Sequence, residues 1–182
     1  MSLTNHGTHI LLLTGNPGIG KTTLLCRVSE QVRDLSMSGF YTQELRESGQ
    51  RTGFRLITFT GREGIIAHVD FDHHWQVGKY GVDVPAIDRF AESTLTLNEA
   101  IDLYFVDEIG KMECLSNRFI DHMRLLLSTD KIVIATLSKT GGGLIAQTKQ
   151  WPHSEVWEVN KANRDAMVTQ VISWLKERVH LT

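Results

Sequence analysis

The sequence predicts an α/β protein in which helices flank a mostly parallel β-sheet. Apolar segments of strand length alternate along the chain with segments in which apolar residues recur at helical spacing. A glycine-rich turn joins the first such strand to the first helix. Three short runs rich in β-branched and aromatic residues interrupt the alternation and predict a small antiparallel hairpin excursion around residues 39–69. We expect one domain over residues 1–182, a length that supports one hydrophobic core.

The first half of the chain begins with a strand, a turn and a helix. His9–Thr14 is a short apolar run that stops at Gly15, which is typical of a buried strand. Thr22–Leu35 carries apolar residues at helical spacing and predicts a helix. The antiparallel strands are then expected at Gly39–Leu45, Gly53–Thr60 and Gly64–Val69. An irregular loop is expected over residues 70–81.

The second half of the chain repeats the alternation of strand and helix. The expected buried strands are Leu103–Val106, Lys131–Thr136 and Glu155–Val159. The expected helices are Pro85–Leu97, which Asp83 would start, Phe119–Leu127, Leu144–Gln150 and Asn163–His180. In such sheets ligands bind at the carboxyl ends of the parallel strands, so we expect the functional site there.

The composition excludes several classes of protein. With 19 Lys and Arg against 21 Asp and Glu, the net charge of −2 gives no sign of a nucleic-acid or membrane partner. Two cysteines, Cys26 and Cys114, are too few for a disulfide framework, and the eight histidines form no metal-ligating cluster. The apolar run Ile10–Leu13 is too short for a signal peptide or a membrane span. We therefore expect a cytoplasmic protein. We also expect it to be a monomer.

The decisive motif is a phosphate-binding loop, which matches the pattern G-x-x-x-x-G-K-[ST] over its full length. It consists of Gly15, Asn16, Pro17, Gly18, Ile19, Gly20, Lys21 and Thr22. Glycines allow the backbone N–H groups to point inward as an anion nest, and the following helix adds its positive end. Lys21 is expected to reach the β- and γ-phosphates, and the Thr22 hydroxyl to bind Mg²⁺.

A strand that ends on acidic residues is the second half of the expected site. Asp107 follows an apolar strand and is expected to hold the magnesium ion together with Thr22. Glu108 is then placed to face the γ-phosphate and polarise an attacking water, although a helix N-terminal carboxylate is the simpler alternative. Glu113 is expected at the surface or in a supporting position.

Three further residues are weaker candidates at the same edge of the sheet. Arg164 and Lys139 follow expected strands and could stabilise charge on the phosphoryl oxygens, or could be solvated loop charges. Thr136 ends a strand and is a candidate contact of the γ-phosphate. The segment 160–163 is similar to the NKxD pattern of GTPases, but Asn163 replaces the aspartate that would bind guanine, so we expect no strong guanine preference.

A tyrosine and three arginines mark the expected hairpin region. This group consists of Tyr41, Arg46, Arg51 and Arg55. A hairpin beside a phosphate loop could form a lid or a partner surface. We favour the interpretation that the arginine charges lie on edge strands and discourage aggregation.

At residues 107–113 (DEIGKME) the chain resembles the THEP-type nucleoside-triphosphatases, also called cancer-related nucleoside-triphosphatases. The resemblance runs nearly end to end and includes residues 15–24, 39–54, 77–84 and 163–165. Gln43 and Cys114 are departures from the usual family residues, and neither is a phosphate-binding position. The resemblance implies a RecA-like P-loop domain and magnesium-dependent hydrolysis of several nucleoside triphosphates (ATP, GTP, CTP and UTP). It also implies nucleotide-binding positions in the phosphate loop and at Leu103, Tyr104, Phe105, Val106, Asp107, Glu108, Ile109 and Gly110.

The leading interpretation is a magnesium-dependent nucleoside-triphosphatase with broad base specificity. In it Lys21, Glu108 and Arg164 are the catalytic residues, and Glu108 orients the attacking water. One alternative is a small nucleoside or nucleotide kinase, which would need an acceptor pocket and usually an arginine-rich lid. Another is a nucleotide-gated binding module in which slow hydrolysis resets a switch.

Overall fold

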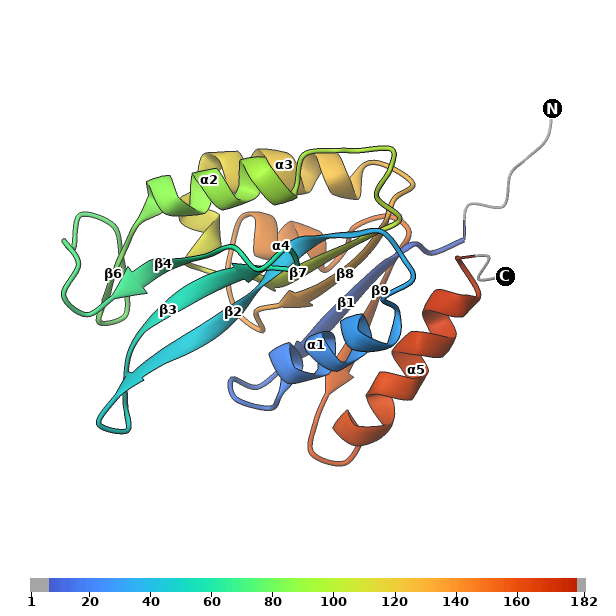
Figure 1. Cartoon of the computed structure of the whole chain (residues 1–182), viewed down its shortest axis with the longest axis horizontal. Helices are drawn as coiled ribbons and strands as arrows, with labels where there is room; N and C mark the ends of the chain where they lie inside the picture. Colours follow the sequence, from blue (N-terminus) through green and yellow to red (C-terminus); the bar gives the residue numbers. More distant parts are fainter. Residues whose placement is uncertain (1–6, 180–182) are drawn as a thin grey trace.

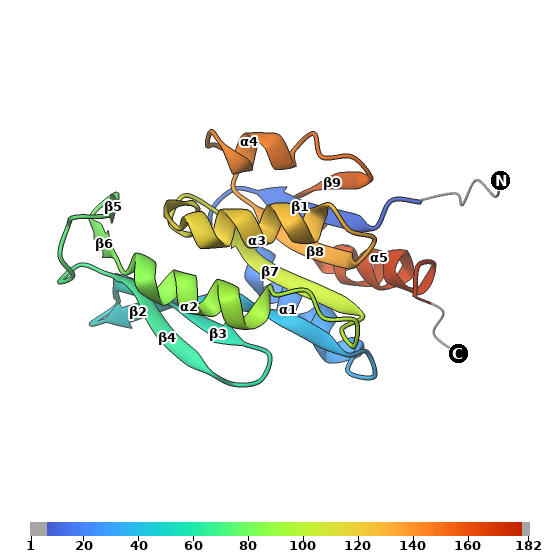
Figure 2. The same cartoon turned by 90° about the horizontal axis from the view of Figure 1, so that it is seen from above.

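The computed structural model describes residues 7–179 and contains one mixed β-sheet with helices on both faces (Figures 1 and 2). Its strands are β1 (Ile10–Gly15), β2 (Met37–Glu47), β3 (Gln50–Thr58), β4 (Glu63–His68), β5 (Gln76–Val77), β6 (Tyr80–Val82), β7 (Leu103–Ile109), β8 (Ile132–Leu137) and β9 (Ser154–Val159). Its helices are α1 (Lys21–Gln31), α2 (Val84–Thr94), α3 (Asn117–Leu127), α4 (Leu144–Thr148) and α5 (Arg164–Lys176), with a 3-10 turn η1 at Glu113–Leu115. The last expected residue of the final helix, His180, lies outside the described residues.

The strand order is β5-β6-β4-β3-β2-β7-β8-β1-β9, and it confirms the predicted α/β fold. Strands β2, β7, β8, β1 and β9 form the parallel part. Only residues Met37–Phe40 of β2 pair with β7, after which the same strand continues into an antiparallel hairpin with β3. The hairpin excursion is therefore an extension of a parallel strand, and its tip projects beyond the body of the protein (Figure 1).

Two details of the predicted sheet were wrong. Residues 70–81 are not wholly irregular, since the short strands β5 and β6 pair within and just after this segment. The strand at Glu155–Val159 was expected in the core, but β9 pairs only with β1 and forms an edge of the sheet. Val156 on this strand is 43% exposed. The prediction failed because an apolar run alone does not distinguish a central strand from an edge strand.

The sheet separates two hydrophobic layers. Helices α2, α3 and α4 cover one face, and α1 and α5 cover the other (Figures 1 and 2). Because side chains alternate along each strand, neighbouring residues of β1 enter different layers. Leu12 packs into the layer of α2 and α3, and Leu11 and Leu13 into that of α1 and α5. Burial on both faces explains why the central strands are continuously apolar.

Side-chain caps begin two of the helices on the α2–α3 face. The Asp83 carboxylate accepts a hydrogen bond from the Ala86 N–H at 2.9 Å, and a proline in the first turn favours the helical backbone. Asp83 thus starts α2 as predicted. The Ser116 hydroxyl caps α3 by accepting from the Phe119 N–H at 2.9 Å. Helix α1 begins differently: Gly20 precedes it and no side chain caps its first turn.

Candidate active site

The phosphate loop connects β1 to α1, and its conformation depends on its glycines. A Cβ atom at Gly15 would lie 2.5 Å from the Val159 carbonyl oxygen of β9, so a side chain does not fit there. Gly20 has a φ of 107°, a conformation that L side chains rarely adopt. It turns the chain into α1 and leaves the first N–H groups of the helix without a side-chain cap. This geometry suits an anion at the helix N-terminus.

Lys21 lies at the base of the loop and is 9% exposed. Its Nζ donates to the Gly15 carbonyl oxygen at 3.2 Å and lies 3.8 Å from Glu108 Oε2. The cation is thus held between the loop and the carboxyl end of β7. The structure brings the phosphate loop and the acidic strand end together at this contact.

Asp107 is held by three threonines from three different elements. Its Oδ2 accepts from the Thr22 hydroxyl at 2.7 Å and from the Thr42 N–H at 3.1 Å. Its Oδ1 accepts from the Thr136 hydroxyl, and its backbone carbonyl accepts from the Thr42 hydroxyl at 2.5 Å. Burial raises the pKa of Asp107, and the hydrogen bonds from these threonines and the charge of Lys21 oppose that rise.

Two of these threonines differ from the sequence-based expectation. Thr136 was a candidate γ-phosphate contact, and its hydroxyl instead orients Asp107. Thr42 was missed as a site residue, although it lies within residues 39–54, one of the segments that carry the family resemblance. No local pattern signals its role, because it reaches Asp107 only through the pairing of β2 with β7.

The residues at this point fit a magnesium ion. Thr22 and Asp107 bring a hydroxyl and a carboxylate oxygen to within 2.7 Å of each other, directly beside the phosphate loop. Mg²⁺ prefers such hard oxygen donors and is usually shared between protein and phosphate oxygens. Two protein ligands are sufficient when the phosphate oxygens of a nucleotide complete the coordination shell of the ion.

Glu108 lies within β7, so the alternative of a helix N-terminal carboxylate is wrong. The pairing of β7 with β8 shifts register between Val106 and Ile109. At this irregularity Asp107 is 2% exposed, whereas the Glu108 side chain is 34% exposed. Burial raises the pKa of Glu108, Lys21 lowers it, and Asp107 raises it again. Glu108 is therefore a carboxylate at the edge of solvent, beside the lysine.

The other predicted site residues of β7 serve mainly as its scaffold. Their side chains are fully buried in the two hydrophobic layers: Leu103, Tyr104, Phe105, Val106 and Ile109. Gly110 follows the strand, and a Cβ atom there would lie 2.9 Å from Glu108 Oε1. These residues place Asp107 and Glu108 at the carboxyl end of the strand.

The two candidate cations lie at different distances from the phosphate loop. Lys139 Nζ donates to the Asn16 side chain at 3.1 Å and lies 2.6 Å from a Glu158 carboxylate oxygen. Arg164 begins α5, is about half exposed and pairs with its neighbour Asp165 at 3.8 Å. In the described residues the structure brings Lys139, and not the Arg164 guanidinium, into contact with the loop.

The loop after β9 holds its asparagines in internal hydrogen bonds. Asn163 Oδ1 accepts from the Asn160 N–H at 2.8 Å, and Asn163 Nδ2 donates to the Glu158 carbonyl at 2.8 Å. Asn160 Oδ1 accepts from two further N–H groups of the loop. Both ends of the Asn163 amide are thus used within the loop.

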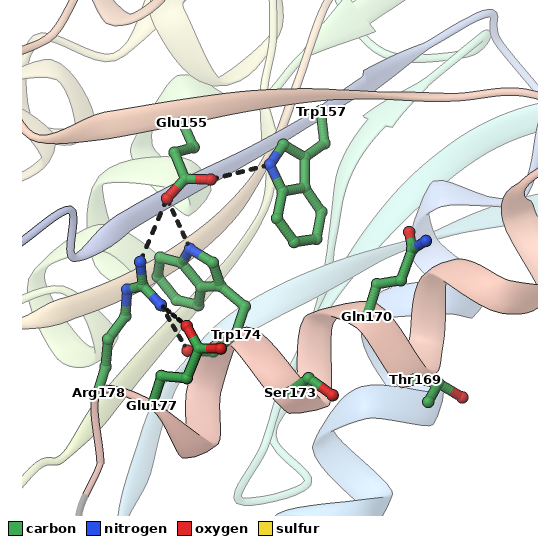
Figure 3. A pocket seen from close by; sticks show the side chains of 8 residues that line it. All are labelled: Glu155, Trp157, Thr169, Gln170, Ser173, Trp174, Glu177 and Arg178. Atoms are coloured by element: carbon green, nitrogen blue, oxygen red, sulfur yellow. Dashed lines mark hydrogen bonds and ion pairs between the residues drawn. The ribbon is translucent and has the colours of Figure 1, made fainter.

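A groove of about 390 Å³ lies between β9 and α5, and the contacts of its lining residues hold these two elements together (Figure 3). Among its lining residues, the Glu155 carboxylate accepts hydrogen bonds from the indole N–H groups of Trp157 and Trp174 and pairs with Arg178. The Arg178 guanidinium also lies 4.0 Å from the Trp174 ring. These contacts fasten α5 to the edge strand, away from the carboxyl end where the phosphate loop lies.

Two features are absent from residues 7–179. No group of three or more His, Cys, Asp or Glu side chains is arranged to hold a metal ion there. In the same part of the chain no helix is long and apolar enough to cross a membrane.

Comparison with known proteins identifies relatives over most of the chain. A family described as NTPase matches residues 10–172. The nucleoside-triphosphatase THEP1 of Thermotoga sp. (strain RQ2) is 36% identical over 167 residues, which cover 91% of this chain and 95% of the relative. The cancer-related nucleoside-triphosphatase of Homo sapiens is 31% identical over 179 residues, which cover 90% and 94%.

Solved structures of the same kind of protein share the fold. The crystal structure of THEP1 from Aquifex aeolicus has a TM-score of 0.77 at 30% identity and covers 92% of this chain and 99% of its own. The solution structure of the human cancer-related nucleoside triphosphatase has a TM-score of 0.78 at 30% identity and covers 93% and 98%. With the phosphate loop, the acidic end of β7 and this end-to-end similarity, the chain belongs to the NTPase family of THEP1-type nucleoside-triphosphatases.

Proposed function

We propose that this protein hydrolyses nucleoside triphosphates to diphosphates and phosphate with Mg²⁺, and that Glu108 orients the attacking water. The observation that carries the proposal is the position of Glu108, whose Oε2 lies 3.8 Å from Lys21 Nζ. Lys21 is expected to bind the β- and γ-phosphates. A carboxylate beside that lysine is therefore beside the phosphorus atom that water attacks.

The protein's own residues divide the work between them. The N–H groups of the phosphate loop and of the α1 N-terminus bind the phosphates, and Lys21 neutralises charge on the γ-phosphate. Thr22 and Asp107 would hold a magnesium ion, which would supply positive charge to offset the negative charge of the phosphates. Thr42 and Thr136 keep Asp107 in one orientation. Glu108 accepts a hydrogen bond from water and directs its lone pair at the phosphorus.

The contact between Lys21 and Glu108 explains how binding prepares the site. Without nucleotide the two charges partly neutralise each other across 3.8 Å. A γ-phosphate is a stronger partner for Lys21, because it offers several anionic oxygens at hydrogen-bond distance. Lys21 turned to the phosphate leaves the Glu108 carboxylate free to bind water. In this proposal the Glu108 carboxylate then faces the water beside the γ-phosphate without competition from Lys21.

Broad base specificity is part of the proposal. The Asn163 amide is engaged at both ends by the loop that contains it, so it is not free to read a base edge. A strong preference for one base needs a polar site that a wrong base would leave unpaired. We expect ATP, GTP, CTP and UTP to be hydrolysed within about tenfold of one another.

Phosphate release from the four nucleotides tests the proposal, with Lys21→Ala, Glu108→Gln and a surface control, Glu92→Gln. Glu92 is an exposed residue of α2 that pairs with Arg118. We expect Glu108→Gln to keep nucleotide affinity and to lose about 100-fold or more in kcat. Lys21→Ala is expected to lose both nucleotide affinity and kcat, and the control Glu92→Gln is expected to keep both. Unchanged kcat in Glu108→Gln removes Glu108 from the mechanism. Diphosphate formation that rises when a nucleoside or nucleotide acceptor is added, with no matching rise in phosphate release, identifies a kinase instead.

A further inference from the structure

Glu113 is a buried carboxyl group to which the proposed hydrolysis assigns no role. It begins η1, which follows β7 after a short turn, and it is 4% exposed. Its neighbours Met112, Cys114 and Leu115 pack against the hydrophobic layer of α2 and α3. These contacts hold η1 against the core and keep the carboxyl group out of solvent. Of the two positions expected for Glu113, at the surface or in a supporting role, the surface position is wrong.

The Glu113 and Glu108 carboxyl groups approach each other at Gly110. A Cβ atom at Gly110 would lie 2.8 Å from Glu113 Oε2 and 2.9 Å from Glu108 Oε1. Two atoms this close to one point are less than 6 Å apart. Because residue 110 is a glycine, no side chain stands between the two carboxyl groups at this point. The backbone groups of Glu113 and Gly110 act in the opposite direction to burial and lower the pKa of the Glu113 carboxyl.

The groups that face Glu113 from β7 are acidic. Burial is the largest cause that raises its pKa, Glu108 and Asp107 raise it further, and the pKa reaches about 8. The adjacent Cys114 thiol, whose pKa burial raises to about 12, is uncharged at neutral pH. Glu113 is therefore mostly a neutral carboxylic acid at pH 7, with an O–H group that can donate.

Charged groups on the helices around η1 are engaged elsewhere. On α2, the Asp88 carboxylate accepts from the Ser116 hydroxyl. On α3, Arg118 pairs with the exposed Glu92 at 3.0 Å. On α1, Lys21 lies beside Glu108. The carboxylate toward which a donor on Glu113 can turn is thus that of Glu108.

We propose that Glu113 is a positioning residue whose protonated carboxyl group donates a hydrogen bond to the Glu108 carboxylate and holds it toward the attacking water. This proposal rests on the proposed function, because it acts through Glu108. Loss of the Glu113 proton would remove the donor and place two negative charges less than 6 Å apart. Turnover is then expected to fall as the pH rises through about 8.

The test measures kcat and KM for magnesium–ATP from pH 6 to pH 10 in the wild type, Glu113→Gln, Glu113→Ala and the surface control Glu92→Gln. Glutamine keeps an N–H donor at every pH, whereas alanine has none. We expect Glu113→Ala to lower kcat at pH 7 by about tenfold or more, with KM within about threefold. We expect Glu113→Gln to keep most of kcat at pH 7 and to lose the alkaline fall of the wild type. The control is expected to follow the wild type at every pH.

Glu108→Gln and the double variant Glu108→Gln/Glu113→Ala separate this proposal from the proposed function. If Glu113 acts through Glu108, the double variant is no slower than Glu108→Gln alone. An inactive Glu108→Gln with an unaffected Glu113→Ala overturns the role of Glu113 only. An active Glu108→Gln overturns the water role and this proposal together. If Glu113→Ala does not fold, an alkaline fall of equal size in Glu113→Gln and wild type overturns the proposal.

Discussion

Replacing Glu113 by glutamine should make the protein less sensitive to alkaline unfolding. The folded-state pKa of Glu113 is about 8, and the ordinary value is 4.5. A raised pKa means that the folded state binds the proton more tightly than the unfolded state does. The stability from this group is fully present below pH 4.5 and is lost as the pH rises through about 8.

The size of this stability change follows from the difference between the folded-state and the ordinary pKa of Glu113. Each unit of pKa difference corresponds to about 1.4 kcal/mol, so the wild type should lose about 4 kcal/mol from this group between pH 5 and pH 9. Glutamine does not ionise and avoids this loss. All other titrating groups are shared, so their effects cancel to first order in the difference between the two proteins.

Urea unfolding at pH 5, 7 and 9 measures this difference in the wild type, Glu113→Gln and the surface control Glu92→Gln. We expect the free energy of unfolding of Glu113→Gln to gain on that of the wild type as the pH rises, by about 4 kcal/mol at most. For a chain of this size that corresponds to roughly 10 °C in Tm at the alkaline end. A difference between Glu113→Gln and wild type that stays constant from pH 5 to pH 9 would refute the reasoning.

Two further substitutions test other contacts. Thr42→Val removes the hydroxyl that donates to the Asp107 carbonyl oxygen at 2.5 Å and keeps the backbone N–H bond to the carboxylate. We expect Thr42→Val to cost about 1 kcal/mol of stability and to raise the magnesium concentration that gives half-maximal activity. A magnesium titration measures this, with Thr169→Val on α5 as the control. Unchanged stability and magnesium dependence in Thr42→Val would contradict the role of Thr42 in holding Asp107. Glu155→Ala removes the acceptor shared by Trp157, Trp174 and Arg178, and is expected to lower the unfolding free energy by about 2–4 kcal/mol while kcat at 25 °C stays unchanged. Stability equal to that of the wild type in Glu155→Ala would show that the groove contacts do not fasten α5.

Local patterns predicted the elements around the site because their causes are local. The apolar run of β1, the glycines of the phosphate loop and the helical spacing of α1 are all contained within the first 35 residues. Asp83 and Pro85 likewise mark the start of α2 through contacts within one turn. The position of β9 at the sheet edge was not predictable in this way, because strand order depends on contacts between distant segments.

By itself the sequence determined the α/β class, the phosphate loop, and Asp107 and Glu108 at the end of an apolar strand. Only the tertiary structure decided what surrounds those two carboxylates. Thr42 contacts Asp107 from a position 65 residues away, and Thr136 from 29 residues away. Glu113 is buried because η1 packs against the α2–α3 layer, which no local periodicity records. The physical reason is that spacing along the chain reports hydrogen bonds and faces within one element, whereas burial and long-range partners depend on which elements pack together.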